Sequence, residues 1–195
     1  PDIEELLGKC TGVILGPGLG TAPETEEAII LLVRRIITEK KPLVLDADAI
    51  KPIGENLTLI QKSTTVVTPQ VGEFKKLTGI TLTQDLDDRI TVVKEWAKKI
   101  GITIFLKGYI DVLSNGTDVK QNNVHNEAMT VGGTGDVLAG IIGAMLSKGV
   151  RPFEAARVAA FLNGEAGNEA FQKKSYGLLA TDIIDEIPNI LKKYL

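Results

Sequence analysis

Short apolar runs and longer amphipathic segments alternate along this chain. The apolar runs are too short for helices and stop at glycine, proline or acidic residues, which is typical of buried strands. Four such runs occur, at 13–15, 43–45, 65–67 and 103–106. Between them, apolar residues recur with helical periodicity. This alternation, with short connections, predicts an α/β fold built on a mostly parallel sheet.

Several of the predicted helices begin and end at recognisable signals. The helix after the first strand has Pro23 in its first turn, and Thr21 and Glu24 have the spacing of a capping box. Gly79 is expected to end a short helix that follows the third strand. Gly101 is expected to end the amphipathic helix before the fourth strand.

A hairpin is predicted after the fourth strand. Asn115-Gly116 separates two β-like segments, 111–114 and 118–120, and Asn-Gly favours a type I′ turn. The hairpin would add an antiparallel edge to the parallel sheet.

Two helices in the last third of the chain are rich in small residues, namely Gly140, Gly143 and Ala144 in the first and Ala155, Ala156, Ala159 and Ala160 in the second. Small residues at helical spacing let two backbones approach closely, so we expect a packed helix pair. Asn163-Gly164 is expected to interrupt the second helix where a flat ligand could touch it, and packing is the alternative explanation. Thr181 is expected to cap the final amphipathic helix.

The stretch 126–140 carries the strongest chemical signal. Gly132, Gly133, Thr134 and Gly135 lead directly into an apolar helical pattern, so a flexible loop opens onto a helix N-terminus. The first amides of a helix lack internal partners and attract anions, and glycines let a phosphate approach the backbone. Asp136 would be repelled by a phosphate, which indicates a role with a proton or a metal. An ordinary helix cap is the alternative.

Other loops are expected to meet this one. They are Gly16 to Gly20, Asp46 to Asp48, Thr68 to Glu73 and Lys107-Gly108, each directly after a predicted strand. Ligands of open parallel sheets bind beyond the carboxyl ends of the strands, so the loops should converge on one cleft. Asp46 and Asp48 could hold Mg²⁺ through water, contact a sugar hydroxyl or cap the following helix. His125, the single histidine, is interpreted as an ordinary surface residue.

Composition narrows the class of protein. The chain has 195 residues, 44% hydrophobic, enough to bury a substantial single core. Its net charge of -3, without a basic stripe, argues against nucleic-acid binding. Cys10 is the only cysteine, which excludes an internal disulfide and a cysteine-based zinc site. No apolar run reaches membrane-spanning length, so we expect a cytoplasmic protein without a membrane partner.

Five segments together resemble the ADP-dependent NAD(P)H-hydrate dehydratases of the ribokinase-like superfamily. These segments are Gly16 to Gly20, Leu45 to Ala49, Thr68-Pro69 with Gly72 to Phe74, Met129 to Gly140, and Gly177 to Asp182. The resemblance implies a three-layer α/β/α fold over residues 1–195 as a single domain, the C-terminal major portion of the family domain. It also suggests a homotetramer.

The resemblance further implies that the 6S hydrates of NADH and NADPH are dehydrated with ADP, or ATP, as phosphoryl donor and Mg²⁺ bridging the phosphates. Asp136 would be the catalytic base, with Gly133, Thr134 and Gly135 as anion hole. The nucleotide would be bound by Lys107, Gly108, Tyr109, Ile110, Asp111, Gly135 and Asn163. Gly18, Gln70 and Asp136 would bind the hydrate, and Asp46, Glu73 and Asn126 would support the site.

The chain departs from the family pattern in two ways. Gln70 stands where family members commonly have histidine; it can hydrogen-bond the substrate and does not titrate near neutral pH. Family domains also extend upstream of the first glycine loop, and this chain starts at Pro1, so we expect a fragment with an exposed sheet edge. The alternatives are a small-alcohol kinase, of the hydroxyethylthiazole or hydroxymethylpyrimidine type, and a non-catalytic nucleotide-binding fragment.

Overall fold

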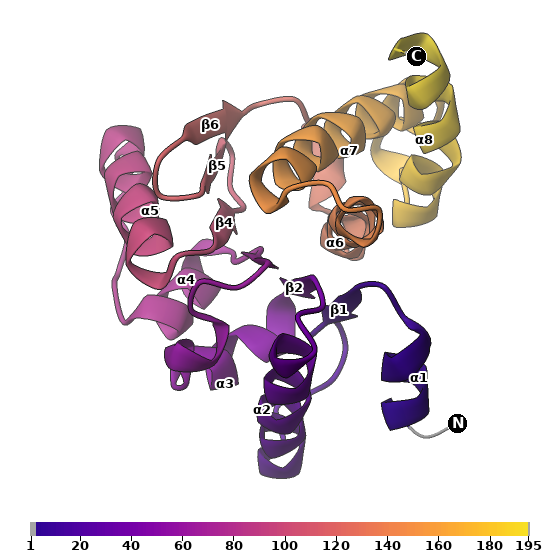
Figure 1. The fold of residues 1–195 in the computed structure, drawn as a ribbon. Coiled ribbons are helices and arrows are strands. Elements are labelled where there is room, and N and C mark those ends of the chain that lie inside the picture. The colour runs from indigo at the N-terminus through magenta and orange to yellow at the C-terminus, as the bar shows by residue number, and fades with distance from the viewer. Residues whose placement is uncertain (1–2, 195) are drawn as a thin grey trace.

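The computed structural model describes residues 3–194, in which one central sheet is covered by helices on both faces (Figure 1). Within these residues the strands lie in the sheet in their chain order: β1 (Val13–Leu15), β2 (Leu43–Leu45), β3 (Thr65–Val67), β4 (Thr103–Leu106), β5 (Asp111–Ser114) and β6 (Val119–Asn122). Neighbours from β1 to β4 are parallel, and β5 is antiparallel to both β4 and β6. The predicted parallel sheet with an antiparallel edge hairpin is confirmed.

The helices precede, connect and follow the strands. They are α1 (Ile3–Lys9), α2 (Pro23–Thr38), α3 (Ile50–Gly54), α4 (Val71–Thr78), α5 (Leu86–Ile100), α6 (Thr134–Ser147), α7 (Pro152–Lys174) and α8 (Ala180–Tyr194). Short 3₁₀ turns are η1 (Ala47–Ala49), η2 (Leu57–Ile60), η3 (Glu127–Thr130) and η4 (Ser175–Gly177). Among the helices of residues 3–194, none has the length and apolar character needed to cross a bilayer.

Alternate strand residues face the two helical layers. Leu43 and Leu45 of β2 pack in the core beneath α2, α3, α4 and α5, whereas Val44 between them packs with α6 and α7. This division arises because successive side chains of a strand point to opposite faces of the sheet. The fold therefore has three layers, with α8 lying outside α7 (Figure 1).

The predicted packed helix pair is present. Ala155, Ala156 and Ala159 of α7 are fully buried and share one core cluster with Ile142 of α6. Gly143 of α6 acts differently from the prediction, because a Cβ atom there would lie 2.6 Å from the side chain of Ile14 in β1. This glycine therefore lets α6 approach the sheet, and the alanines of α7 make the close contact within the pair.

The predicted interruption of α7 at Asn163-Gly164 is wrong. The helix is continuous from Pro152 to Lys174. Gly164 is needed for close packing, since a Cβ atom there would lie 1.6 Å from the carbonyl oxygen of Val124. A dipeptide that often marks turns is thus held in a helix by the segment that packs against it.

Two predicted helix caps are also wrong. The N-cap of α2 is Ala22, which makes no side-chain capping hydrogen bond, so Thr21 does not cap that helix. Thr181 lies inside α8, whose start is instead closed by Asp182 Oδ2, which accepts a hydrogen bond from the Leu179 N–H at 2.9 Å. The predicted ends at Gly79 and Gly101 are confirmed, both with left-handed φ values of 78°.

The hairpin is present without the expected type I′ turn. Such a turn needs positive φ at both central residues, and of the pair only Gly116 has one (89°). The loop is longer, with Ser114 paired to Val119. Asn115 Oδ1 accepts hydrogen bonds from the N–H groups of Thr117 (2.9 Å) and Asp118 (2.7 Å). The asparagine therefore stabilises the loop with its side chain.

Candidate functional site

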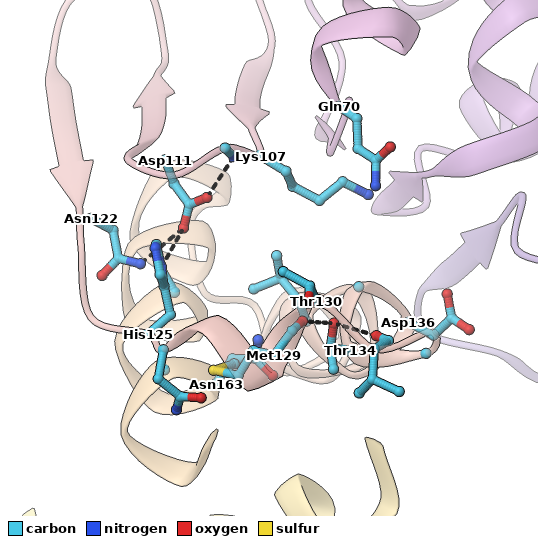
Figure 2. Close-up of a pocket in the computed structure, with 18 of the residues that line it drawn as sticks. Gln70, Lys107, Asp111, Asn122, His125, Met129, Thr130, Thr134, Asp136 and Asn163 are labelled. Carbon is cyan, nitrogen blue, oxygen red and sulfur yellow. Dashed lines mark hydrogen bonds and ion pairs between the residues drawn. The ribbon is translucent and has the colours of Figure 1, made fainter. Parts of the chain in front are cut away.

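A cavity of about 960 Å³ lies beyond the carboxyl end of the sheet, between the β4–β5 loop and the start of α6 (Figure 2). Its lining comes from segments far apart in the sequence, including Asp46 after β2, Gln70 before α4, the loop from Lys107, and the stretch from Asn122 to Asp136. Cavities of this size accommodate ligands as large as a nucleotide. The expected convergence of strand-end loops on one cleft is therefore confirmed for these segments, whereas the predicted participation of the loop Gly16 to Gly20 is wrong, because no residue of that loop lines the cavity.

The start of α6 forms one wall of the cavity. Gly133, the N-cap, adopts a left-handed φ of 94°, which a glycine tolerates best. Val137 donates the first backbone hydrogen bond of the helix, to the Gly133 carbonyl at 3.1 Å. The amides of Thr134, Gly135 and Asp136 consequently have no partner within the helix. They provide the donors and the positive dipole end that an anion requires.

The Thr134 side chain fixes the loop that precedes the helix. Its hydroxyl donates to the carbonyl of Met129 at 2.8 Å and lies 3.2 Å from that of Val131 (Figure 2). Because this hydrogen is used inside the loop, the contribution of Thr134 to an anion site comes from its backbone N–H.

A partly buried ion pair joins the residues that follow β2 and β4, beside this helix start. Lys107 Nζ lies 2.6 Å from Asp46 Oδ1, and Asp46 is only 1% exposed. A Cβ atom on Gly135 would lie 3.6 Å from the same ammonium group. The lysine and the helix dipole therefore place two sources of positive potential at one point of the cavity.

The two carboxylates after β2 have separate partners. Asp48 Oδ2 accepts a hydrogen bond from the Gly20 N–H at 2.8 Å, so it holds the first glycine loop. Asp46 precedes η1 but makes no capping hydrogen bond with its side chain. Neither residue therefore caps the following helix with its side chain. Across residues 3–194, no cluster of three histidine, cysteine or acidic residues has the geometry of a metal site.

Asp136 lies in the first turn of α6 and is exposed to solvent. Figure 2 shows it on the α6 side of the cavity, with Lys107 and Gln70 on the opposite wall. The carboxylate is thus accessible to a ligand that the helix amides hold.

Backbone contacts fix the position of Gln70. Its N–H donates to Glu73 Oε2 at 2.7 Å, half of a capping box at the start of α4. Gln70 also forms a parallel bridge with Lys107, whose N–H donates to the Pro69 carbonyl at 2.8 Å. The two residues therefore keep a fixed spacing across the cavity wall.

Asp111 anchors the β4–β5 loop. Its Oδ1 accepts a hydrogen bond from the Gly108 N–H at 3.0 Å, and its Oδ2 accepts one from Asn122 Nδ2 at 2.9 Å. Burial raises the pKa of this carboxyl, and the two hydrogen bonds and the charges of His125 and Lys107 oppose that rise. The loop is thereby tied to the hairpin strands.

Two further asparagines line the cavity. Asn126 caps η3 by accepting from the Ala128 N–H at 3.1 Å, and it donates to Asn168 of α7 at 2.9 Å. Asn163 is 8% exposed, and its Oδ1 has no hydrogen-bond partner within the described part of the chain. Buried polar atoms are normally paired, so this amide is poised for a ligand or water.

The structure separates the predicted site residues into two groups. Those that line the cavity are Asp46, Gln70, Glu73, Lys107, Gly108, Tyr109, Asp111, Asn126, Gly133, Thr134, Gly135, Asp136 and Asn163. Gly18 and Ile110 are not part of that lining. Gly18 lies in the loop after β1 with a left-handed φ of 70°.

The lining residues that sequence reasoning missed include one histidine and two further aromatic side chains. His125, interpreted as an ordinary surface residue, lies in the cavity wall against Tyr109 and Asp111. Phe171 and Tyr176, from α7 and η4, also contribute to the wall. These residues contact segments that are distant along the chain, so local sequence patterns do not indicate their place in the cavity. For His125, the one available signal was its position directly before the glycine-rich stretch.

Comparison with known proteins gives a consistent result. A model of the NAD(P)H-hydrate dehydratase family matches residues 2–189. The bifunctional NAD(P)H-hydrate repair enzyme Nnr of Pyrobaculum aerophilum is 46% identical over 183 residues, which cover 93% of this chain and 36% of that enzyme. The chain thus spans about a third of that curated relative.

Two solved structures show the same fold. A ribokinase-like superfamily protein of Enterococcus faecalis has a TM-score of 0.82 and 27% identity, over 98% of this chain and 66% of that one. The ADP/ATP-dependent NAD(P)H-hydrate dehydratase of Bacillus subtilis, co-crystallised with ATP and Mg²⁺, has a TM-score of 0.78 and 27% identity, over 97% and 69%.

Proposed function

Because the chain belongs to the NAD(P)H-hydrate dehydratase family, we propose that it dehydrates the 6S hydrates of NADH and NADPH, with ADP as phosphoryl donor. AMP and phosphate would be the other products. The observation that supports the proposal is that three groups lie in one cavity: the Lys107 ammonium group, the free amides at the start of α6 and the accessible Asp136 carboxylate.

In the first step, the hydroxyl oxygen of the hydrate attacks the β-phosphorus of ADP. Asp136 takes the hydroxyl proton, a new P–O bond forms, and the bond from the β-phosphorus to the bridging oxygen breaks to release AMP. In the second step, the C–O bond of the phosphorylated hydrate breaks, phosphate leaves with the bonding electron pair, and a ring carbon gives a proton to water. The nicotinamide double bond is thereby restored.

The anion hole of this proposal consists of the backbone N–H groups of Gly133, Thr134 and Gly135. They would hold the migrating phosphoryl group while Lys107 neutralises part of its charge. Asp46 would act indirectly, because its ion pair fixes the position of the Lys107 ammonium group.

The remaining contacts with the nucleotide and the hydrate are assigned mainly to residues that line the cavity. The loop from Lys107 to Asp111 and Gly135 would bind the nucleotide, with the unpaired amide of Asn163 near its base. Gln70, which Glu73 orients, would bind the hydrate together with Asp136. Contact with Gly18 would require that the hydrate extend beyond the cavity toward the loop after β1, and Ile110 would act through the backbone of its loop.

Mg²⁺ would arrive with the nucleotide. In phosphoryl-transfer sites this ion is commonly held by phosphates, water and one or two carboxylates. Besides the base Asp136, the lining offers the carboxylates of Glu73 and Glu127. When bound, the ion would neutralise charge that develops on the phosphates.

The direct test incubates the chain with NADHX, ADP and Mg²⁺ and follows the recovery of NADH absorbance, with ATP in a parallel reaction. Recovery with either nucleotide supports the proposal. Phosphorylation of hydroxyethylthiazole by ATP, without NADH recovery, would instead favour the small-alcohol kinase. Nucleotide binding without turnover of hydrate or alcohol would favour a non-catalytic binding fragment.

The phosphate position can be tested at Gly135. We expect Gly135→Ala to weaken ADP binding about tenfold, since its methyl group would occupy the space between the helix start and Lys107. Isothermal titration calorimetry measures the effect. The fold should tolerate the change because the nearest atom, Lys107 Nζ, is at an ordinary contact distance of 3.6 Å.

Gly140→Ala is the matched control for this variant, because it lies in the same helix with nothing within 4 Å of the added Cβ. It should bind ADP like the unmodified chain. Unchanged affinity in Gly135→Ala would show that the helix start does not hold the phosphate.

A further inference from the structure

Asn163 of α7 carries a buried hydrogen-bond acceptor that nothing in the protein satisfies. The residue lines the cavity and is 8% exposed. Among the buried side-chain oxygen and nitrogen atoms that the structure describes, Asn163 Oδ1 is the one without a hydrogen-bond partner. Burying such an acceptor costs free energy, because folding removes it from water without replacing its hydrogen bond. At the wall of a cavity, this cost indicates an atom that a ligand satisfies.

The side chains next to Asn163 in the cavity are apolar. Phe105 of β4, Leu138 of α6 and Ala160 of α7 are buried, line the cavity and belong to one core cluster. Ala160 lies one turn before Asn163, so the two share a face of the helix. We call these three residues the apolar wall. An apolar surface beside one unsatisfied acceptor suits a flat ring with a polar edge.

The direction of phosphoryl transfer assigns this part of the cavity to the nucleotide. In such a transfer, the attacking and leaving oxygens lie roughly in line on opposite sides of the phosphorus. In the proposed reaction, the hydrate hydroxyl is on the side of Asp136 and Gln70. Figure 2 shows Asn163 away from both of these residues. The leaving AMP therefore extends toward α7, where its base can reach the apolar wall.

We propose that Asn163 selects the base of the nucleotide, with Oδ1 accepting a hydrogen bond from the exocyclic amino group of a 6-aminopurine whose ring lies against the apolar wall. This inference rests on the proposed function, in which ADP binds in this cavity, and adds the group that recognises its base. The amide nitrogen of Asn163 can donate to a ring nitrogen at the same time, a pairing that asparagine commonly makes with adenine. A base without the amino group leaves Oδ1 unpaired in the complex.

The first test compares two nucleotides on the unmodified chain. They are ADP and purine riboside 5′-diphosphate, which has a hydrogen atom in place of the 6-amino group. We expect the analogue to bind about tenfold more weakly, since one buried hydrogen bond is missing and its acceptor stays unpaired. The phosphates and the ribose are the same in both, so their contacts cancel in the ratio. Isothermal titration calorimetry gives the two dissociation constants.

The variant Asn163→Leu isolates the contact with the amino group. Leucine has the same branched skeleton without an acceptor, so the variant should bind ADP and the analogue with affinities within about twofold of each other. Asn168→Leu is the matched control. Asn168 is on the same helix and outside the cavity lining, and its Oδ1 already accepts from Asn126 Nδ2 at 2.9 Å. The control should keep the preference for ADP.

The thermal stability of the nucleotide-free chain tests the unpaired acceptor independently. Asn163→Leu removes this acceptor from a buried place, so we expect its Tm to rise by about 2–4 °C. Asn168→Leu removes an amide that is paired, so its Tm should fall. Differential scanning calorimetry measures both changes. If the side chain of Asn163 served only to stabilise the fold, its replacement would lower Tm as well.

The outcomes separate this inference from the proposed function. If the unmodified chain binds neither ADP nor the analogue, the proposed function fails. If it binds both equally well, the function stands and the role of Asn163 is wrong. A preference for ADP that persists in Asn163→Leu, or a lower Tm of this variant, would also overturn the role of Asn163. The comparison of two nucleotides on the unmodified chain does not depend on the folding of any variant.

Discussion

Replacing Asp136 with asparagine is expected to lower kcat for hydrate dehydration about a thousandfold, with ADP affinity changed less than about threefold. Asparagine preserves the size of the side chain but cannot accept the proton of the attacking hydroxyl. The helix amides and Lys107, which would hold the phosphates, remain in place. Single-turnover recovery of NADH and calorimetric titration with ADP measure the two quantities separately.

Asp87→Asn is the matched control for this variant. Asp87 is also an exposed aspartate in the first turn of a helix, α5, and it is not part of the cavity lining. It should retain full activity. If Asp136→Asn turned over hydrate at the rate of this control, another group would have to take the proton.

Replacing Lys107 with methionine is expected to lower the free energy of unfolding by about 3 kcal/mol, because it leaves the charge of Asp46 buried without its partner. ADP affinity should fall about 10- to 100-fold, since a charged donor to the phosphates is lost. Urea unfolding and calorimetry measure these effects.

Two further variants distinguish the loss of stability caused by the buried charge from the loss of ADP affinity. In the double variant Asp46→Asn with Lys107→Met, most of the stability should return, because a neutral amide is less costly to bury than a charge. ADP affinity should stay low. Arg157→Met breaks an exposed ion pair of the same 2.6 Å distance, with Glu154, and should change stability by less than about 1 kcal/mol. Equal losses in Lys107→Met and Arg157→Met would contradict the argument.

The sequence predicted those parts of the fold that depend on local pattern. The four parallel strands, the helix ends at Gly79 and Gly101, and the glycine-rich start of α6 are all confirmed. In each case, a short apolar run or a glycine at a required left-handed position determines the local structure. The interpretation of residues 1–195 as a single domain stays a prediction.

Two features were missed because they depend on contacts between distant parts of the chain. Asn163-Gly164 carries a turn signal, yet packing of Val124 against Gly164 keeps α7 continuous. Asp46 could be placed at the ligand edge, but its ion pair with Lys107 joins residues 61 positions apart. Interactions of this kind depend on the order of strands in the sheet, which no local pattern encodes.

The strand order itself has a consequence for biosynthesis. Each strand from β2 to β6 pairs with the strand made just before it, so the sheet can grow one strand at a time as the chain leaves the ribosome. The cavity is different, because Asp136 and Asn163 belong to α6 and α7, which are translated after all six strands of the described sheet. During synthesis, the nascent chain would therefore gain its scaffold early and its capacity to hold a ligand late.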